Sequence, residues 1–159
     1  MSIWIGRARR SVSGEVPAPP EQVRAFYVDL DNISQVHPLV QWVRSTSRLE
    51  LADGYQQGCR VRDRIPLGPL TLPITYRARL IVPATGAVTA QARQFPQVRL
   101  DSRVDFAVTA TGTRITEELR IAAPRPLLAI TVGQAVAAHT AMLAAIGKLF
   151  GACSPRKGE

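Results

Sequence analysis

Between residues 40 and 122 the hydrophobic pattern of this chain has a period of two, interrupted only by short links rich in glycine or proline. Alternation of apolar and polar side chains is typical of strands with one buried face. It predicts six strands, at residues 40–51, 58–67, 70–82, 86–95, 98–109 and 113–122. The links are short enough to be hairpin turns, so we expect these strands to form an antiparallel meander.

A further strand and two short helices are expected before the meander. Residues 7–16 alternate like a strand, and the prolines at 17, 19 and 20 end it. Residues 21–30 carry apolar side chains at helical spacing. Asp31 or Asn32 can cap a second short helix, which ends at His37 because a residue before proline avoids the helical region.

One long apolar segment follows the meander, from Leu127 to Ala152, with no charged residue before Lys148. Its apolar residues recur every three or four positions and form a wide stripe. The segment is long enough to span a bilayer, which takes about 20 residues. Polar residues near its middle, including Gln134, His139 and Thr140, favour a helix packed along a curved sheet instead.

Length and composition restrict the function classes. The 159 residues predict one domain, 1–159, with an ordered core at about 7–151 and a flexible tail at 152–159. The two cysteines cannot form a disulfide scaffold, and no zinc-ligand spacing or dinucleotide-binding motif is present, so we expect no metal and no cofactor. No apolar segment of a secretory signal follows the first arginines, which favours a cytoplasmic location.

The net charge of +8 comes almost entirely from arginine. Pairs and triplets such as Arg60, Arg62 and Arg64 alternate along the predicted strands, so they share the outer face of the sheet. This pattern is typical of a solvated face and also permits weak contact with an anionic membrane. No aromatic residues are interleaved with these arginines, which argues against specific nucleic-acid binding.

The order of elements and two segments resemble the START-like (SRPBCC) superfamily, in particular its polyketide cyclase/dehydrase and lipid-transport family. The segments are V-S-G-E-V-P-A-P-P-E-Q-V-R-A-F-Y-V-D-L-D-N-I at residues 12–33 and G-T-R-I-T-E-E-L-R-I-A-A-P at 112–124. The resemblance implies an α+β helix-grip fold, in which a curved antiparallel seven-strand sheet (β-α-α-β6-α) wraps round the C-terminal helix. It also implies an internal cavity for a hydrophobic ligand; fold alone does not choose that ligand.

Five polar residues fall where the pattern demands apolar ones: Arg10, Asp63, Tyr76, Glu117 and His139. A buried polar group without a partner is costly, so each invites a functional interpretation. Each of these residues also has a structural interpretation. Asp63 can lie at a bulge, Arg10 and Glu117 can pair as neighbours on the first and last strands, and Tyr76 and His139 can be hydrogen-bonded core residues.

We therefore expect a small hydrophobic or aromatic ligand, lipid or polyketide-like, inside the cavity. The predicted ligand-binding residues are Trp42, Asp63, Leu72, Ile74, Tyr76, Leu100, Phe106, Glu117, Leu119, His139 and Met142. One alternative is a polyketide aromatase/cyclase, with His139, Asp63 or Glu117 as the base and Tyr76 as the acid. Another is a lipid carrier that docks an anionic membrane by its basic face.

Overall fold

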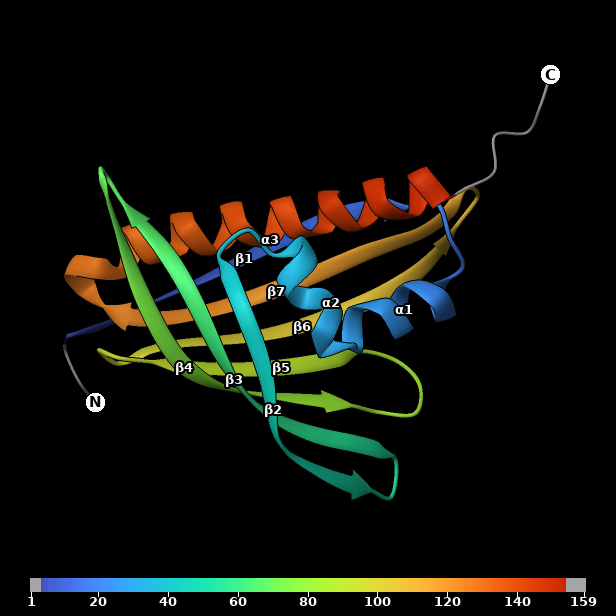
Figure 1. Ribbon diagram of the computed structural model, residues 1–159, viewed down its shortest axis with the longest axis horizontal. Coiled ribbons are helices and arrows are strands. Elements are labelled where there is room, and N and C mark those ends of the chain that lie inside the picture. Colours follow the sequence, from blue (N-terminus) through green and yellow to red (C-terminus); the bar gives the residue numbers. More distant parts are fainter. Residues whose placement is uncertain (1–3, 154–159) are drawn as a thin grey trace.

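The computed structural model describes residues 4–153 and contains a single curved sheet with three helices (Figure 1). In chain order the elements are β1 (Ile5–Val16), α1 (Pro20–Val28), α2 (Leu30–Val36), β2 (Val40–Leu51), β3 (Gly54–Leu67), β4 (Leu70–Val82), β5 (Val88–Gln94), β6 (Val98–Thr109), β7 (Gly112–Pro124) and α3 (Arg125–Cys153). The sheet order is β1-β7-β6-β5-β4-β3-β2, and every neighbouring pair is antiparallel. The predicted meander and its flanking elements are confirmed.

The two short helices begin and end close to the predicted positions. Pro20 occupies the first turn of α1, where its missing N–H is no loss. The cap of α2 differs from the prediction, because Asp29 rather than Asp31 or Asn32 accepts the free backbone N–H of Asp31, at 3.0 Å. His37, before Pro38, has extended backbone angles and ends α2 as predicted.

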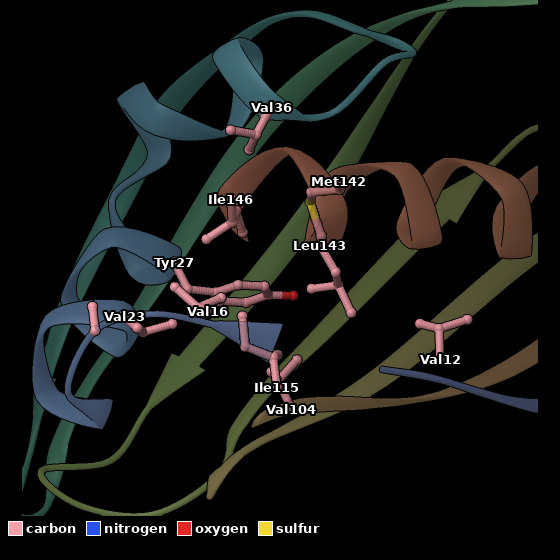
Figure 2. Packing of buried hydrophobic residues seen from close by; sticks show 11 residues of the cluster. Val12, Val16, Val23, Tyr27, Val36, Val104, Ile115, Met142, Leu143 and Ile146 are labelled. Atoms are coloured by element: carbon pink, nitrogen blue, oxygen red, sulfur yellow. The ribbon is translucent and has the colours of Figure 1, made fainter. Parts of the chain in front are cut away.

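The main core lies between α1, β7 and α3. Val23, Ile115, Leu143 and Ile146 are fully buried there. Figure 2 shows the ring of Tyr27 among these side chains, with its hydroxyl directed away from α1. Separate buried clusters lie under β2 and β3, under β4 and β5, and between β7 and the first half of α3. The hydrophobic core therefore surrounds the interior of the curved sheet and does not fill all of it.

Helix α3 lies along β1 and β7 (Figure 1). Length and composition alone would allow it to cross a membrane, but one stripe of it, including Val132, Met142 and Ile146, is buried against the sheet. The helix continues through Cys153, so Ala152 and Cys153 are helical and exposed, not part of a tail as predicted. The rest of the predicted tail, 154–159, lies outside the described residues.

Two glycines allow α3 to approach β1 closely. A Cβ on Gly147 would lie 2.6 Å from the carbonyl oxygen of Glu15, and a Cβ on Gly14 would lie 2.9 Å from Leu143 Cβ. Such distances are below van der Waals contact, so larger residues would push the helix off the strand. Gly133, in the same helix, has no heavy atom within 4 Å of the corresponding position.

We expect Gly147→Ala and Gly133→Ala to change stability in opposite directions. The first places a methyl group against a backbone carbonyl and should cost about 1–3 kcal/mol of unfolding free energy. The second only improves helix propensity and should add about 0.5–1 kcal/mol. Urea denaturation of both variants measures the difference. Equal effects would show that close packing of α3 on β1 is not required.

Candidate functional site

Two connected hollows lie between the sheet and the helices. The first, called here the Asp63 lobe, has a volume of about 120 Å³ and lies under the N-terminal half of α3. The second, the Glu117 lobe, has a volume of about 140 Å³ and lies under α2. Both are lined by His37, Tyr76, Ala92, Leu100 and His139, so these residues stand where the lobes meet. The two lobes together form one cavity that is partly open to solvent.

Asp63 and Tyr76 form the polar part of the first lobe. Val61 is the register partner of Tyr76, so Asp63 lies diagonally across from it on the adjacent strand. Asp63 is buried, and its Oδ1 has no hydrogen-bond partner among the described residues. Burial raises the pKa of Asp63 to about 6, although a hydrogen-bond interaction with Tyr76 and the charge of His139 both act to lower it. Burial, and then the neighbouring Asp63, raise the pKa of Tyr76 well above 10.

Glu117 is the polar centre of the second lobe. It is fully buried on β7, where its Oε1 lies 2.9 Å from His139 Nδ1 and accepts a hydrogen bond from the Tyr27 hydroxyl at 3.3 Å. The distance between His139 Nδ1 and Glu117 Oε1 is short enough for an ion pair, but the two groups are not oriented for a hydrogen bond. Glu117 Oε2 has no partner within the part of the chain that the structure describes. Burial, and then Glu117, raise the pKa of Tyr27 well above 10.

Two histidines meet at the junction of the lobes. The rings of His37 and His139 are edge-to-face, with centroids 5.4 Å apart. His37 Nδ1 accepts the backbone N–H of Leu39 at 3.3 Å, so a neutral His37 carries its proton on Nε2. Burial, followed by the neighbouring His139, lowers the pKa of His37 to about 3. His37 is therefore neutral at physiological pH.

The structure brings together six of the predicted ligand-binding residues and places the other five elsewhere. Asp63, Tyr76, Leu100, Glu117, His139 and Met142 line the lobes. Leu72, 45% exposed, lies on β4 opposite Ile65 and lines neither lobe. Ile74, half-buried, pairs with Asp63 in register but lines neither lobe.

The remaining three residues have packing contacts of their own. Leu119 is fully buried in the cluster between β7 and α3. Phe106 packs edge-to-face on Tyr27, with ring centroids 5.6 Å apart, on the side away from the lobes. Trp42 is half-buried, and the guanidinium of Arg44 lies over its ring, 4.5 Å from the ring centroid.

The predicted pair between Arg10 and Glu117 is wrong. Arg10 is exposed on the edge strand β1, and its guanidinium donates to the carbonyl of Arg9. A long side chain at a sheet edge can reach solvent whichever face its Cβ takes. Tyr27 occupies the position near Glu117, and the sequence analysis missed it because its spacing in α1 also fits an ordinary core aromatic.

Asp63 should make stability depend on pH in an unusual direction. Its folded-state pKa of about 6 lies above the ordinary 3.8, so the folded protein binds the proton more tightly and loses stability as pH rises from about 4 to 6. Asp63→Asn cannot ionise, so relative to the parent it should gain up to about 3 kcal/mol between pH 4 and 7.

Urea denaturation of parent and variant at several pH values measures this difference. The neutral His37 costs stability in the opposite sense, as pH falls from 6.5 toward 3, but it does so equally in both proteins. Asp105→Asn, at an exposed carboxyl, is the control. A constant difference between Asp63→Asn and parent across this range would contradict the raised pKa.

No protein-family model matches the chain, and no curated protein matches it by sequence. Solved structures do match its fold. TTHA0849 from Thermus thermophilus is 17% identical, with a TM-score of 0.70, over 95% of this chain and 99% of that one. The Zhui aromatase/cyclase from Streptomyces sp. R1128 is 13% identical, with a TM-score of 0.70, over 97% of this chain and 98% of that one.

A START superfamily protein from Mycobacterium smegmatis is 14% identical, with a TM-score of 0.64, over 90% of this chain and 98% of that one. These identities are too low to carry an activity across, but the similarities extend over nearly the whole chain. Together with the seven-stranded antiparallel sheet and the long C-terminal helix, they show that the chain has the START-like (SRPBCC) helix-grip fold.

Proposed function

We propose that this protein binds a small hydrophobic or aromatic molecule in the two-lobed cavity. The observation that carries the proposal is the combination of mostly apolar walls, such as Leu100, Met142 and Val61, with polar groups gathered at two points. Ligand sites commonly have this composition, because apolar contact supplies affinity while a few polar groups fix orientation. The fold, which a START superfamily protein shares, supports it.

The size of the lobes limits the ligand. A cavity of roughly 150 Å³ holds one benzene molecule, so each lobe, at about 120 and 140 Å³, has room for about one ring. A molecule with one ring, or a comparable branched group, in each lobe fits the space. A lipid with two long acyl chains does not fit unless α3 moves away from the sheet.

A substitution at the junction of the lobes tests the proposal. Ala92 lines both lobes, so Ala92→Leu should fill the shared space and weaken binding about tenfold or more. Ala122→Leu, on the outer face of β7, should bind like the parent. The measurement is native mass spectrometry after exposure to a metabolite and lipid extract, followed by titration of the ligand found.

Two outcomes would contradict cavity binding. One is a parent protein that carries no adduct after exposure and gives no altered product in the extract. The other is an adduct that Ala92→Leu and Ala122→Leu retain equally, because such a ligand would lie outside the cavity.

A second candidate is an acid–base enzyme of the polyketide cyclase/dehydratase type. The observation in its favour is a carboxyl with a pKa of about 6, Asp63, close to Tyr76 and to the His139–Glu117 pair. A group whose pKa lies near the working pH can both take and return a proton. The base would remove a proton from a carbon between two carbonyls, and that carbon would then bond to a third carbonyl carbon, whose oxygen takes up a proton.

Dehydration would follow when a second proton is removed from carbon and the new hydroxyl leaves as water. The fold shared with the Zhui aromatase/cyclase supports this candidate at the level of architecture only. The extract experiment distinguishes it from simple binding. An enzyme releases a product lighter by one water for each dehydration, whereas a binding protein returns its ligand unchanged.

A third candidate is a lipid carrier, favoured by exposed apolar residues at one end of the molecule. Leu70 is 72% exposed on the β3–β4 turn and Phe95 is 89% exposed after β5. This end also holds the exposed start of α3, including Ile130 (Figure 1). We call the exposed residues here the rim: Arg64, Leu67, Leu70, Leu72, Arg93, Phe95, Arg125, Leu127 and Ile130. The rim combines apolar side chains, which can enter the membrane interface, with arginines, which attract anionic lipid. The outer face of the sheet offers arginines without such apolar residues, so the rim is the better candidate for docking an anionic membrane.

Substitutions on the rim test membrane docking. Phe95→Asn and Leu70→Asn should each lower co-sedimentation with vesicles containing anionic lipid several-fold, because less apolar surface enters the interface. Val108→Asn is the matched control, at a residue 78% exposed toward the opposite end of β6. Binding to neutral vesicles should be weak, and added salt should reduce binding to anionic ones. Equal loss in all three variants would remove this candidate.

A further inference from the structure

Each lobe contains one carboxyl oxygen that is buried and has no partner. These atoms are Asp63 Oδ1 and Glu117 Oε2, and no donor within residues 4–153 reaches either of them. Buried polar atoms in folded proteins nearly always have a hydrogen-bond partner, since an unsatisfied one costs free energy. Asp63 and Glu117 both line the cavity, so their unsatisfied oxygens are candidate acceptors for donors that a ligand supplies.

The cavity offers almost nothing to an acidic ligand. Among its described lining residues Arg79 is the sole lysine or arginine, and that guanidinium already donates to Gln91 Oε1 at 2.6 Å. A ligand carboxylate would therefore meet Asp63 or Glu117 with no free lysine or arginine to neutralise it, and His139 already lies against Glu117. Like charges at short range in a partly dry cavity repel strongly, so fatty acids and other carboxylates fit poorly.

The protein itself shows which donor each carboxyl accepts. The phenol hydroxyl of Tyr27 donates to Glu117 Oε1, and the Tyr76 hydroxyl interacts with the Asp63 carboxyl. Each carboxyl thus interacts with a phenol of the protein and keeps one oxygen, Asp63 Oδ1 or Glu117 Oε2, without a partner among the described residues. His139 Nδ1, 2.9 Å from Glu117 Oε1, already occupies the position next to Glu117 that a ligand cation would take.

Each carboxyl lines one of the two lobes, and the lobes share five lining residues. His139 lies between the carboxyls, in contact with Glu117 and close enough to Asp63 to influence it electrostatically. Tyr76, Ala92 and Leu100 line both lobes, so a molecule placed at this junction would extend into each. A ligand with one ring in each lobe would direct one of its ends toward Asp63 and the other toward Glu117.

We propose that the cavity selects a neutral, hydrophobic molecule with a hydroxyl group at each end, one donating to Asp63 Oδ1 and the other to Glu117 Oε2, and that it rejects carboxylates. This inference rests on the proposed function, because it specifies the ligand class of the same cavity. A phenol-type diol on a fused two-ring frame is the simplest compound with these features.

Probes on one frame test the selection. We would titrate the parent protein with naphthalene, a naphthol, a naphthalenediol with hydroxyls at opposite ends, the corresponding diamine and a naphthoic acid. Each hydroxyl that reaches a buried carboxyl should tighten binding about tenfold, so the diol should bind best. The naphthoate should bind at least about tenfold more weakly than naphthalene itself, because nothing offsets the charge repulsion.

Two variants assign the hydroxyls to the carboxyls. Asp63→Asn and Glu117→Gln each keep the side-chain shape but replace a carboxyl by a neutral amide, so each should remove most of the gain from one hydroxyl and admit the naphthoate more readily. Because Glu117 is fully buried, Glu117→Gln could fold poorly; Asp63→Asn, at the other lobe, gives the same comparison independently. Asp105→Asn on the surface should keep the order of the parent.

The outcomes separate the two proposals. If naphthalene and its derivatives all bind with similar affinity, carboxylate included, the selection of hydroxyls is wrong while cavity binding stands. If the diamine binds more tightly than the diol, the cavity prefers cations and the inference is also overturned. If none of the probes binds the parent and no ligand comes from an extract, the proposed function itself fails.

Discussion

Close packing of α3 on β1 is the contact from which the interior of this protein follows. Gly14 and Gly147 bring helix and strand backbones together, with Leu143 and the carbonyl of Glu15 at the contact. Helix α3 is held against β1 and β7, α2 against β2, and α1 reaches β6, with Val28 and Leu30 packed on the buried residues of β4 and β5. The sheet curves around the space that is left, and the two lobes are what its side chains do not fill.

The polar groups in that space reduce stability, which argues for a role outside folding. Asp63 holds its proton up to a pH of about 6, and His37 stays neutral down to about 3, so each resists the charge state it would take in water. Apolar residues of similar size would avoid these costs, since replacing buried charged groups by hydrophobic ones is often neutral or stabilising. Groups kept at a cost to stability are common where a protein binds or transforms something.

The sequence predicted the framework well because alternation is a local signal. The bounds of β2, β4 and β6 match the prediction residue for residue, and the burial of Asp63 and Glu117 follows from the phase of their strands. Phase does not say how far the packing on a face extends along a strand, so Leu72 was placed in the cavity although its side chain is 45% exposed. Alternation also says nothing of where long side chains end, which is why Arg10 was misplaced.

The polar site itself was less predictable. Tyr27 and His37 reach the cavity because α1 and α2 fold over β2 and β6, and that arrangement depends on contacts distant in sequence. In α1, a tyrosine at helical spacing resembles any core aromatic. Its hydrogen bond to a residue 90 positions later has no local signature. The prediction that His139 faces inward needed only the helical period, whereas its contact with Glu117 required the register of β7 under α3.

Both lobes of the cavity are partly open to solvent, which is compatible with exchange of a ligand. The β3–β4 hairpin is tied to α3 by the Gln134 side chain, whose Nε2 donates to the carbonyl of Pro66 at 3.1 Å on the exposed surface. An exposed hydrogen bond contributes about 1 kcal/mol, so separating the hairpin from the helix costs little. The close contact of Gly147 with β1, in contrast, lies toward the other end of α3 and would stay in place. Motion confined to the hairpin end would widen the Asp63 lobe, which Gln134 helps to line.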